Sequence, residues 1–196
     1  MDPSLLGLTT AFGLATAAGL NTLLPLLLVG LLARVGLLEL ASPYSSLAGD
    51  IALGGIAFLA LLEIAGDKVP GLDSVVQTVQ WPLAGAAGAI LFASQSSAIS
   101  WVSPELAILV GLLTSGAVHG VRTAARPAIT VSTMGIANPV VSVIEDVVAV
   151  ALVLASVLAP VLGVVILIAV AVAGVVLLRW TLKRGLPLVR WLRASR

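Results

Sequence analysis

Residues 138–182, NPVVSVIEDVVAVALVLASVLAPVLGVVILIAVAVAGVVLLRWTL, decide the fold class of this chain. Only three charged side chains interrupt the stretch, namely Glu145, Asp146 and Arg179. A helix needs about 20 apolar residues to cross roughly 30 Å of hydrocarbon, so the stretch is long enough for two crossings. Pro160 divides it, because proline disfavours a continuous helix. The sequence therefore predicts two membrane-spanning helices, at 138–159 and 161–182.

The whole chain has a similarly apolar composition. Of its 196 residues, 60% are hydrophobic and 10% are charged, whereas soluble domains have about 45–50% apolar and about 25% charged residues. A chain this short cannot bury so much apolar surface in one core. The composition therefore predicts an integral membrane protein, and it excludes a soluble enzyme, a disordered chain and a nucleic-acid-binding protein. The absence of Cys also excludes disulfides and Cys-based metal sites.

The N-terminal part is interrupted within its apolar run. Residues 5–38 contain one charge, Arg34, and as a single helix they would be about 51 Å long, which exceeds one ordinary crossing. Gly19, Asn21 and Pro25 predict a break into two pieces, 5–18 and 21–37, of which the first is short enough to be re-entrant. Three further spans are expected, at 47–66, 81–97 and 105–121.

These segments together predict an all-α fold, a polytopic membrane helix bundle of six or seven helices with a broken or re-entrant N-terminal helical pair. The break has a partial counterpart, because Gly19-x-Asn21 with Pro25 is similar to Gly135-x-x-Asn138-Pro139. Duplicated halves that meet at broken helices are common in transporters. A possible internal repeat is therefore part of the expectation.

Positive charge is distributed asymmetrically along the chain. Cytoplasmic loops are enriched in Lys and Arg, and of the ten such residues only Arg34 falls on the side opposite the C-terminus in the predicted topology. We therefore expect a multi-pass protein with a cytoplasmic C-terminus. Residues 1–182 form a single membrane domain, and residues 183–196, KRGLPLVRWLRASR, form a basic tail at the lipid–water interface.

Two groups of acidic residues lie within or next to predicted spans, where ionisable groups are costly and suggest function. In the first group, Glu63 and Asp67 are four residues apart and share a helical face if the helix reaches Asp67. This spacing favours a shared proton or cation. The alternative is that Lys68 neutralises Asp67 at the interface while Glu63 lies near headgroup depth.

The second group follows Asn138 and Pro139, which are a typical pair for a helix start. Asn138, Ser142 and Glu145 then lie on one stripe, with Glu145 about 10 Å beyond the start of the helix. Asp146 is rotated by about 100° from Glu145, so at least one of the two carboxylates needs a partner on another helix. The alternative to an ion or proton role is a carboxylic acid that joins helices by hydrogen bonds.

Two neutral groups complete the candidate set. Pro25 would leave the Asn21 carbonyl without its helical partner, and carbonyl and amide oxygens suit a hard cation. The alternative is a proline kink that serves packing. His119 is expected in the same half of the bundle, either as a ligand or as a structural or solvated residue near a helix end.

Three segments, GLNTLLPLLL (19–28), LEIAGDKVPGLDSVVQTVQ (62–80) and NPVVSVIEDVVAV (138–150), resemble a family of small bacterial inner-membrane proteins known only as a domain of unknown function. The resemblance covers most of residues 7–182 and implies a bacterial inner (plasma) membrane location, but no activity. Residues 63–69 are also similar to the Glu-x-Gly-Asp-Lys/Arg-Thr/Ser signature of calcium/manganese–proton exchangers. They depart from it by an extra residue before Gly66 and by Val69 in place of the hydroxyl residue.

The function we expect is a small membrane transporter or channel for an inorganic cation, with or without proton coupling. The expected metal ligands are Glu63, Asp67 and Glu145. The wider ion- or substrate-binding set adds Asp146, Asn21, Asn138, Ser142 and His119. No cofactor is expected, because a divalent cation or Na⁺ would be the substrate, and oxygen ligands without Cys favour such ions.

The alternative is a non-transporting scaffold or lipid-binding protein that self-associates through small-residue helix faces such as 84–89, AGAAGA. Membrane lipid is an expected partner under both hypotheses, and a homo-oligomer is compatible with both. An enzyme is not expected, because no hydrolase motif such as HExxH or GxSxG occurs in the sequence.

Overall fold

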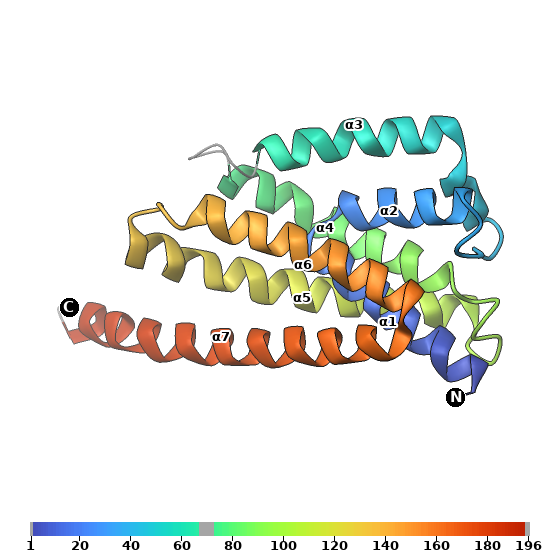
Figure 1. Cartoon of the computed structure of the whole chain (residues 1–196). Helices are drawn as coiled ribbons and strands as arrows, with labels where there is room; N and C mark the ends of the chain where they lie inside the picture. The colour runs from blue at the N-terminus through green and yellow to red at the C-terminus, as the bar shows by residue number, and fades with distance from the viewer. Residues whose placement is uncertain (1, 67–72, 195–196) are drawn as a thin grey trace.

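The computed structural model describes residues 2–66 and 73–194. Within these ranges the chain forms seven α-helices and one short 3-10 helix, with no strand, as Figure 1 shows. The bounds are α1 Pro3–Leu20, α2 Leu23–Arg34, η1 Tyr44–Ala48, α3 Asp50–Gly66, α4 Asp73–Ala93, α5 Pro104–Thr133, α6 Asn138–Leu158 and α7 Pro160–Ala194. The predicted all-α helical bundle is confirmed.

Among the described residues, four helical segments are long and apolar enough to cross a membrane, namely α1, α5, α6 and residues 160–179 of α7. The outer surface of the bundle is apolar as well. On α7, for example, Val165, Ile168 and Val172 are each more than half exposed. Such a surface is stable in hydrocarbon and unstable in water. The chain is therefore a helical membrane protein.

The first two helices form a re-entrant pair. In Figure 1 the N-terminus and the α2–α3 connection lie at the same end of the bundle, while the turn between α1 and α2 lies in its interior. Asn21 ends α1 in an extended conformation. Its side-chain Oδ1 accepts a hydrogen bond from the Leu24 amide at 2.9 Å, which caps the start of α2. The predicted break is confirmed.

Pro25 has a different local role from the one the sequence suggested. It is the third residue of α2, and the first amides of a helix have no intrahelical partner, so a proline there removes no hydrogen bond. Pro25 therefore follows the break and does not kink a continuous helix. The prediction that it frees the Asn21 carbonyl within a helix is wrong, because α1 has already ended.

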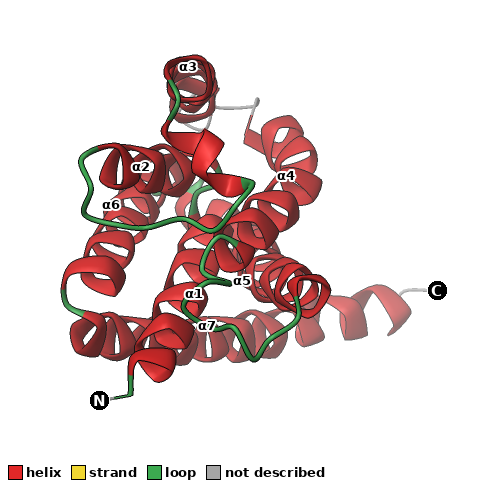
Figure 2. Cartoon of the chain, turned by 90° about the vertical axis from the view of Figure 1, so that its right-hand side faces the viewer, coloured by secondary structure: helices red, strands yellow, loops and turns green. Residues whose placement is uncertain are grey.

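Helix α1 runs through the middle of the bundle, where Figure 2 shows it surrounded by other helices. It packs against α4, α5, α6 and α7. Small residues permit this close packing. A Cβ atom at Gly13 would lie 2.9 Å from the Ser156 Cβ of α6, and one at Gly19 would lie 2.6 Å from the Ser115 carbonyl oxygen of α5. Leu14 of α1 and Leu152 of α6 belong to the same buried core.

At the start of the chain, Asp2 caps α1, where its carboxylate accepts a hydrogen bond from the Ser4 amide at 3.0 Å. The side-chain hydrogen bond from the Ser4 hydroxyl also lowers the pKa of Asp2.

Several helices are longer than the sequence predicted. Helix α5 continues through Pro127 to Thr133, whereas the prediction ended it at residue 121. Helix α4 begins at Asp73 and passes through Pro82, and α7 continues as helix through the segment predicted as a separate tail. A proline removes one hydrogen bond, and membrane helices tolerate this loss when neighbouring groups compensate for it. As a consequence, Arg122 and Arg126 lie inside a helix rather than in a loop.

Candidate functional site

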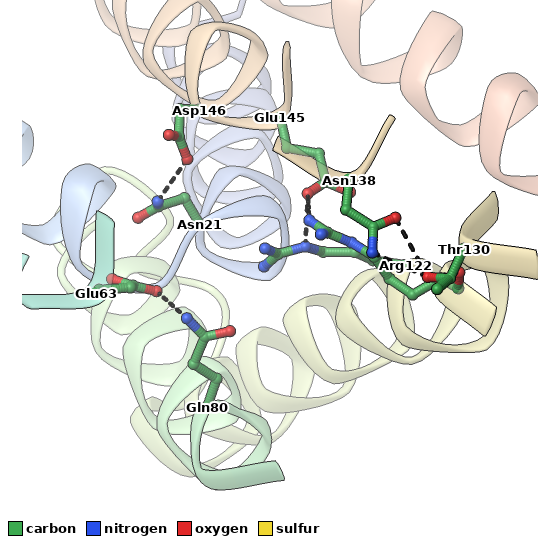
Figure 3. A network of polar contacts seen from close by, with 9 residues as sticks. Asn21, Glu63, Gln80, Arg122, Thr130, Asn138, Glu145 and Asp146 are labelled. Carbon is green, nitrogen blue, oxygen red and sulfur yellow. Dashed lines mark hydrogen bonds and ion pairs between the residues drawn. The ribbon is translucent and has the colours of Figure 1, made fainter. Parts of the chain in front are cut away.

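Several buried polar side chains of α3, α4, α5 and α6 lie around the break between α1 and α2. Figure 3 shows them as separate contacts around this break. Three contacts matter most: one at Glu63, one between Asn21 and Asp146, and one at Glu145.

Glu63 of α3 binds the backbone amides at the start of α2, which have no partner within that helix. Its carboxylate accepts hydrogen bonds from the Thr22 amide at 3.1 Å and from the Leu23 amide at 3.0 Å. The Gln80 amide of α4 donates a third bond at 3.0 Å. The first amides of a helix carry partial positive charge, so a carboxylate is stabilised there. Glu63 is 7% exposed, so the protein encloses its carboxylate; Asp67 and Lys68, on which the predicted alternative depends, lie outside the described residues.

Asn21 connects the break to α6. Its Nδ2 donates a hydrogen bond to Oδ1 of Asp146 at 2.9 Å, while its own Oδ1 accepts the Leu24 amide. The Asn21 residue is 1% exposed. Asn21 therefore ends α1 through its backbone, while its side chain caps α2 and binds a carboxylate of α6.

Glu145 of α6 lies against two arginines of α5. Oε2 of Glu145 accepts a hydrogen bond from Nε of Arg122 at 2.8 Å and a second from Nη2 of Arg126. The arginine side chains are 3% and 5% exposed, and the Glu145 side chain is 16% exposed. The prediction that one of the two adjacent carboxylates needs a partner on another helix is correct, and in fact both have one.

Arg122 and Arg126 were predicted to lie in a loop and were therefore not predicted as site residues. Their spacing of four residues puts both on one face of α5, together with His119 one turn earlier. That spacing is the signal that could have found them, had the helix been extended through Pro127. His119 is fully buried, so the alternative of a solvated residue near a helix end is wrong.

Asn138 has a partner other than the predicted one. It is the first residue of α6, and the residue at the capping position is Ala137, which makes no side-chain cap. The Asn138 side chain instead contacts Thr130 of α5, where its Nδ2 donates a hydrogen bond to the Thr130 hydroxyl at 2.9 Å. Asn138 therefore ties α6 to α5 near their connection and does not cap the helix.

Two buried hydroxyl groups lie next to these contacts. Ser142 is fully buried and lies one turn before Asp146 on α6. Thr22 is 1% exposed, and its backbone amide donates one of the hydrogen bonds that Glu63 accepts. Neither Oγ of Ser142 nor Oγ1 of Thr22 has a hydrogen-bond partner among the described residues. Ser142 was predicted as a site residue; Thr22 was not, because a lone threonine beside Asn21 gave no signal of its own.

The structure brings together only part of the predicted set. Asn21 contacts Asp146, and Glu63 binds the two residues that follow Asn21, whereas Glu145 makes a separate contact with α5, as Figure 3 shows. Asp67 lies outside the described residues. Across the described parts of the chain, no group of three or more His, Cys, Asp or Glu side chains could hold a metal ion. The three-carboxylate metal site therefore gains no support.

The small-residue face predicted for self-association packs within the chain. A Cβ atom at Gly88 of α4 would lie 2.7 Å from the Gly111 carbonyl oxygen of α5, and one at Gly111 would lie 2.7 Å from the Phe92 Cβ. Helices α4 and α5 therefore touch along this face, as small residues permit. Gly88 is covered by the chain's own α5.

Comparison with known proteins gives one match. Residues 8–180 match a family model described as a domain of unknown function, DUF4126. No curated protein and no solved structure matches the chain. The first resemblance noted in the sequence is thus confirmed, and the similarity to calcium/manganese–proton exchangers receives no support from these comparisons.

Proposed function

Because the chain belongs to the DUF4126 family of unknown function, we propose its function from its buried site: it is a small membrane transporter for an inorganic cation, coupled to protons. The observation that carries the proposal is the position of the α1–α2 break. The break lies between two carboxylates, Glu63 and Asp146, in the interior of a membrane bundle. In membrane transporters, interrupted helices of this kind surround ion and substrate sites.

The chemistry of the surrounding groups favours a hard cation. Carboxylate oxygens from Glu63 and Asp146 lie on either side of Asn21. The buried hydroxyls of Thr22 and Ser142, which have no hydrogen-bond partner among the described residues, offer further oxygens. An all-oxygen site suits Na⁺, Mg²⁺, Ca²⁺ or Mn²⁺ better than softer metals. In this proposal Glu63 and Asp146 take the role that the sequence suggested for Glu145.

Proton coupling follows from the bonds that Glu63 makes. The ionised carboxylate accepts hydrogen bonds from two backbone amides at the start of α2. A protonated carboxyl group is a weaker acceptor and loses the favourable interaction with the helix dipole. Proton binding at Glu63 therefore weakens the hold on α2, and a cation that competes with the proton is linked to the same movement.

We also propose the finer localisation, a bacterial inner membrane with a cytoplasmic C-terminus. The cation distribution supports it, because α2 ends at the exposed Arg34, and this end of α2 lies at the opposite end of the bundle from the C-terminus in Figure 1. Asp50, the ion-pair partner of Arg34, lies at that same end.

The test is reconstitution of the purified chain into liposomes that contain a pH-sensitive dye. Na⁺, Mg²⁺, Ca²⁺ or Mn²⁺ is added outside the liposomes, one at a time. At least one of these cations should cause protons to leave the interior, which the dye reports as a rise in internal pH. Glu63→Gln and Asp146→Asn should each abolish the signal, while Asp50→Asn, at an exposed position, should leave it unchanged. Proton release equal to that of protein-free liposomes for every cation would overturn the proposal, as would full activity of both site variants. Absence of flux from the folded protein would favour the non-transporting scaffold.

A further inference from the structure

The guanidinium group of Arg126 has more hydrogen-bond donors than the described structure satisfies. Arg126 is 4% exposed, and its Nη2 binds Oε2 of Glu145. Its Nε and Nη1 are buried and have no hydrogen-bond partner in the described part of the chain. Arg122, one turn earlier, uses the same carboxylate oxygen. Two guanidinium groups thus converge on one oxygen atom.

This arrangement is unusual for a purely structural ion pair. A guanidinium presents a planar fork of N–H donors that matches two oxygens of a carboxylate or phosphate. Burying charged donors without acceptors is costly, and it is most costly inside a membrane. Helix packing alone would be served by one arginine that binds Glu145 in the two-oxygen geometry.

We propose that Arg126 and Arg122 form a binding site for a phosphate group, in which Glu145 occupies the anion position when no ligand is bound. Glu145 already supplies a carboxylate, with a single charge. A phosphate offers more oxygens and up to two charges, which matches two guanidinium groups. Glu145 is the most exposed of the three side chains, at 16%, so it can move aside when the phosphate enters.

The position of the site is compatible with two sources of phosphate. Arg126 lies about 10 Å before the end of α5, the end that faces the α5–α6 connection. A lipid headgroup and a free phosphate both carry the oxygens that this site would bind. The site does not depend on the proposed cation transport, because Glu63 and Asp146 bind elsewhere.

The experiment measures the thermal unfolding of the purified full chain in detergent, followed by Trp fluorescence. Inorganic phosphate is titrated at constant ionic strength, with chloride as the replacement ion. Glu145→Gln removes the internal competitor, so its apparent Kd for phosphate should be at least about tenfold lower than that of the wild type. Adding Arg126→Gln to this variant should abolish the gain. Asp50→Asn, which removes the acidic partner of the exposed Arg34, is the matched control and should not change the response.

A parallel series replaces inorganic phosphate with phosphatidic acid in mixed micelles, with phosphatidylcholine as the neutral comparison. A larger response to phosphatidic acid identifies a lipid headgroup as the ligand, and a larger response to inorganic phosphate identifies a solute. Arg126→Lys, which keeps the charge and loses the fork, should weaken binding of the effective probe in the otherwise wild-type chain. This variant decides the outcome if Glu145→Gln does not fold. The proposal is overturned if neither probe stabilises the protein beyond its control, or if Arg126→Gln leaves the gain of Glu145→Gln intact and Arg126→Lys binds as the wild type does.

Discussion

Glu145 and Asp146 are neighbours on α6, yet their carboxylates bind different helices. Glu145 lies against Arg122 and Arg126 of α5, whereas Asp146 accepts a hydrogen bond from Asn21 at the α1–α2 break. Consecutive helical residues differ by about 100° in direction, so one turn of α6 can serve two neighbours. This turn therefore links the arginine cluster to the re-entrant pair.

The contact at Glu145 predicts a large loss of stability when the carboxylate is neutralised. Glu145→Gln removes the carboxylate that two buried guanidinium groups contact, and breaking a buried ion pair costs about 3–5 kcal/mol. The measurement is the unfolding free energy in detergent without added phosphate. Asp50→Asn removes an ion pair whose side chains are 49% and 83% exposed, and it should cost about 0–1 kcal/mol. Equal costs for the two variants would contradict a buried Glu145 contact.

The contact between Asn21 and Asp146 predicts energetic coupling. In a double-mutant cycle, Asn21→Ala and Asp146→Ala should show an interaction energy of about 0.5–3 kcal/mol, because the two side chains share a hydrogen bond. A second cycle pairs Asn21→Ala with Asn138→Ala. Asn138 lies two turns before Asp146, about 12 Å away along α6, and binds Thr130. This pair should be additive, and coupling of equal size in both cycles would argue against the direct bond.

The role of Glu63 predicts a local effect on α2. Glu63→Ala removes the acceptor of the Thr22 and Leu23 amides, and each buried donor left unsatisfied costs about 1–3 kcal/mol. Hydrogen exchange at the start of α2 should therefore become faster, with α1 less affected. Asp2→Ala is the matched control, since Asp2 caps α1 through the Ser4 amide and should affect the start of α1 alone. Unchanged exchange at residues 22 and 23 would exclude capping by Glu63.

The close approach of α4 and α5 predicts opposite outcomes at two glycines. Gly88→Ala would place a Cβ atom 2.7 Å from the Gly111 carbonyl oxygen, and overpacking of this kind costs about 1–3 kcal/mol. A Cβ atom at Gly54 of α3 meets nothing within 4 Å. Gly54→Ala should therefore leave stability unchanged or raise it by up to about 1 kcal/mol, the difference in helix propensity. Thermal unfolding in detergent measures both, and a destabilised Gly54→Ala with a neutral Gly88→Ala would contradict the packing described.

The topology predicts on which side engineered thiols react. The chain has no Cys, so a single engineered cysteine can be labelled without any signal from native thiols. Ser45 in η1 and Ser132 near the end of α5 are both exposed. In Figure 1 the α2–α3 connection, which contains η1, and the C-terminal end of α5 lie at opposite ends of the bundle. In intact bacterial cells a membrane-impermeant maleimide should label Ser45→Cys and not Ser132→Cys, and permeabilised cells should show both. The reverse pattern would invert the proposed orientation, and labelling of both in intact cells would contradict the fold.

The sequence predicts the membrane class, the N-terminal break and several polar residues of the site, because each has a local cause. Apolar length decides the first, and Gly19, Asn21 and Pro25 decide the second. It does not predict which carboxylate faces which helix. Glu145 and Asp146 are adjacent, and the rotation of α6 that separates their roles depends on its packing against α1 and α5.

The contact of Arg122 and Arg126 with Glu145 was missed for a similar reason. Pro127 predicts the end of a helix by its local chemistry, whereas α5 continues for six residues beyond it. Asn138 of α6 binds Thr130 beyond the proline, and Glu145 of α6 binds two arginines of α5 before it. Such contacts come from residues elsewhere in the chain, so the sequence around Pro127 could not reveal them.

The re-entrant pair formed by α1 and α2 begins and ends at the same end of the bundle. The chain therefore continues into α3 from the same side of the membrane on which it began. The pair therefore adds no crossing of its own to the topology, and the helices from α3 onward set the sidedness of every later loop.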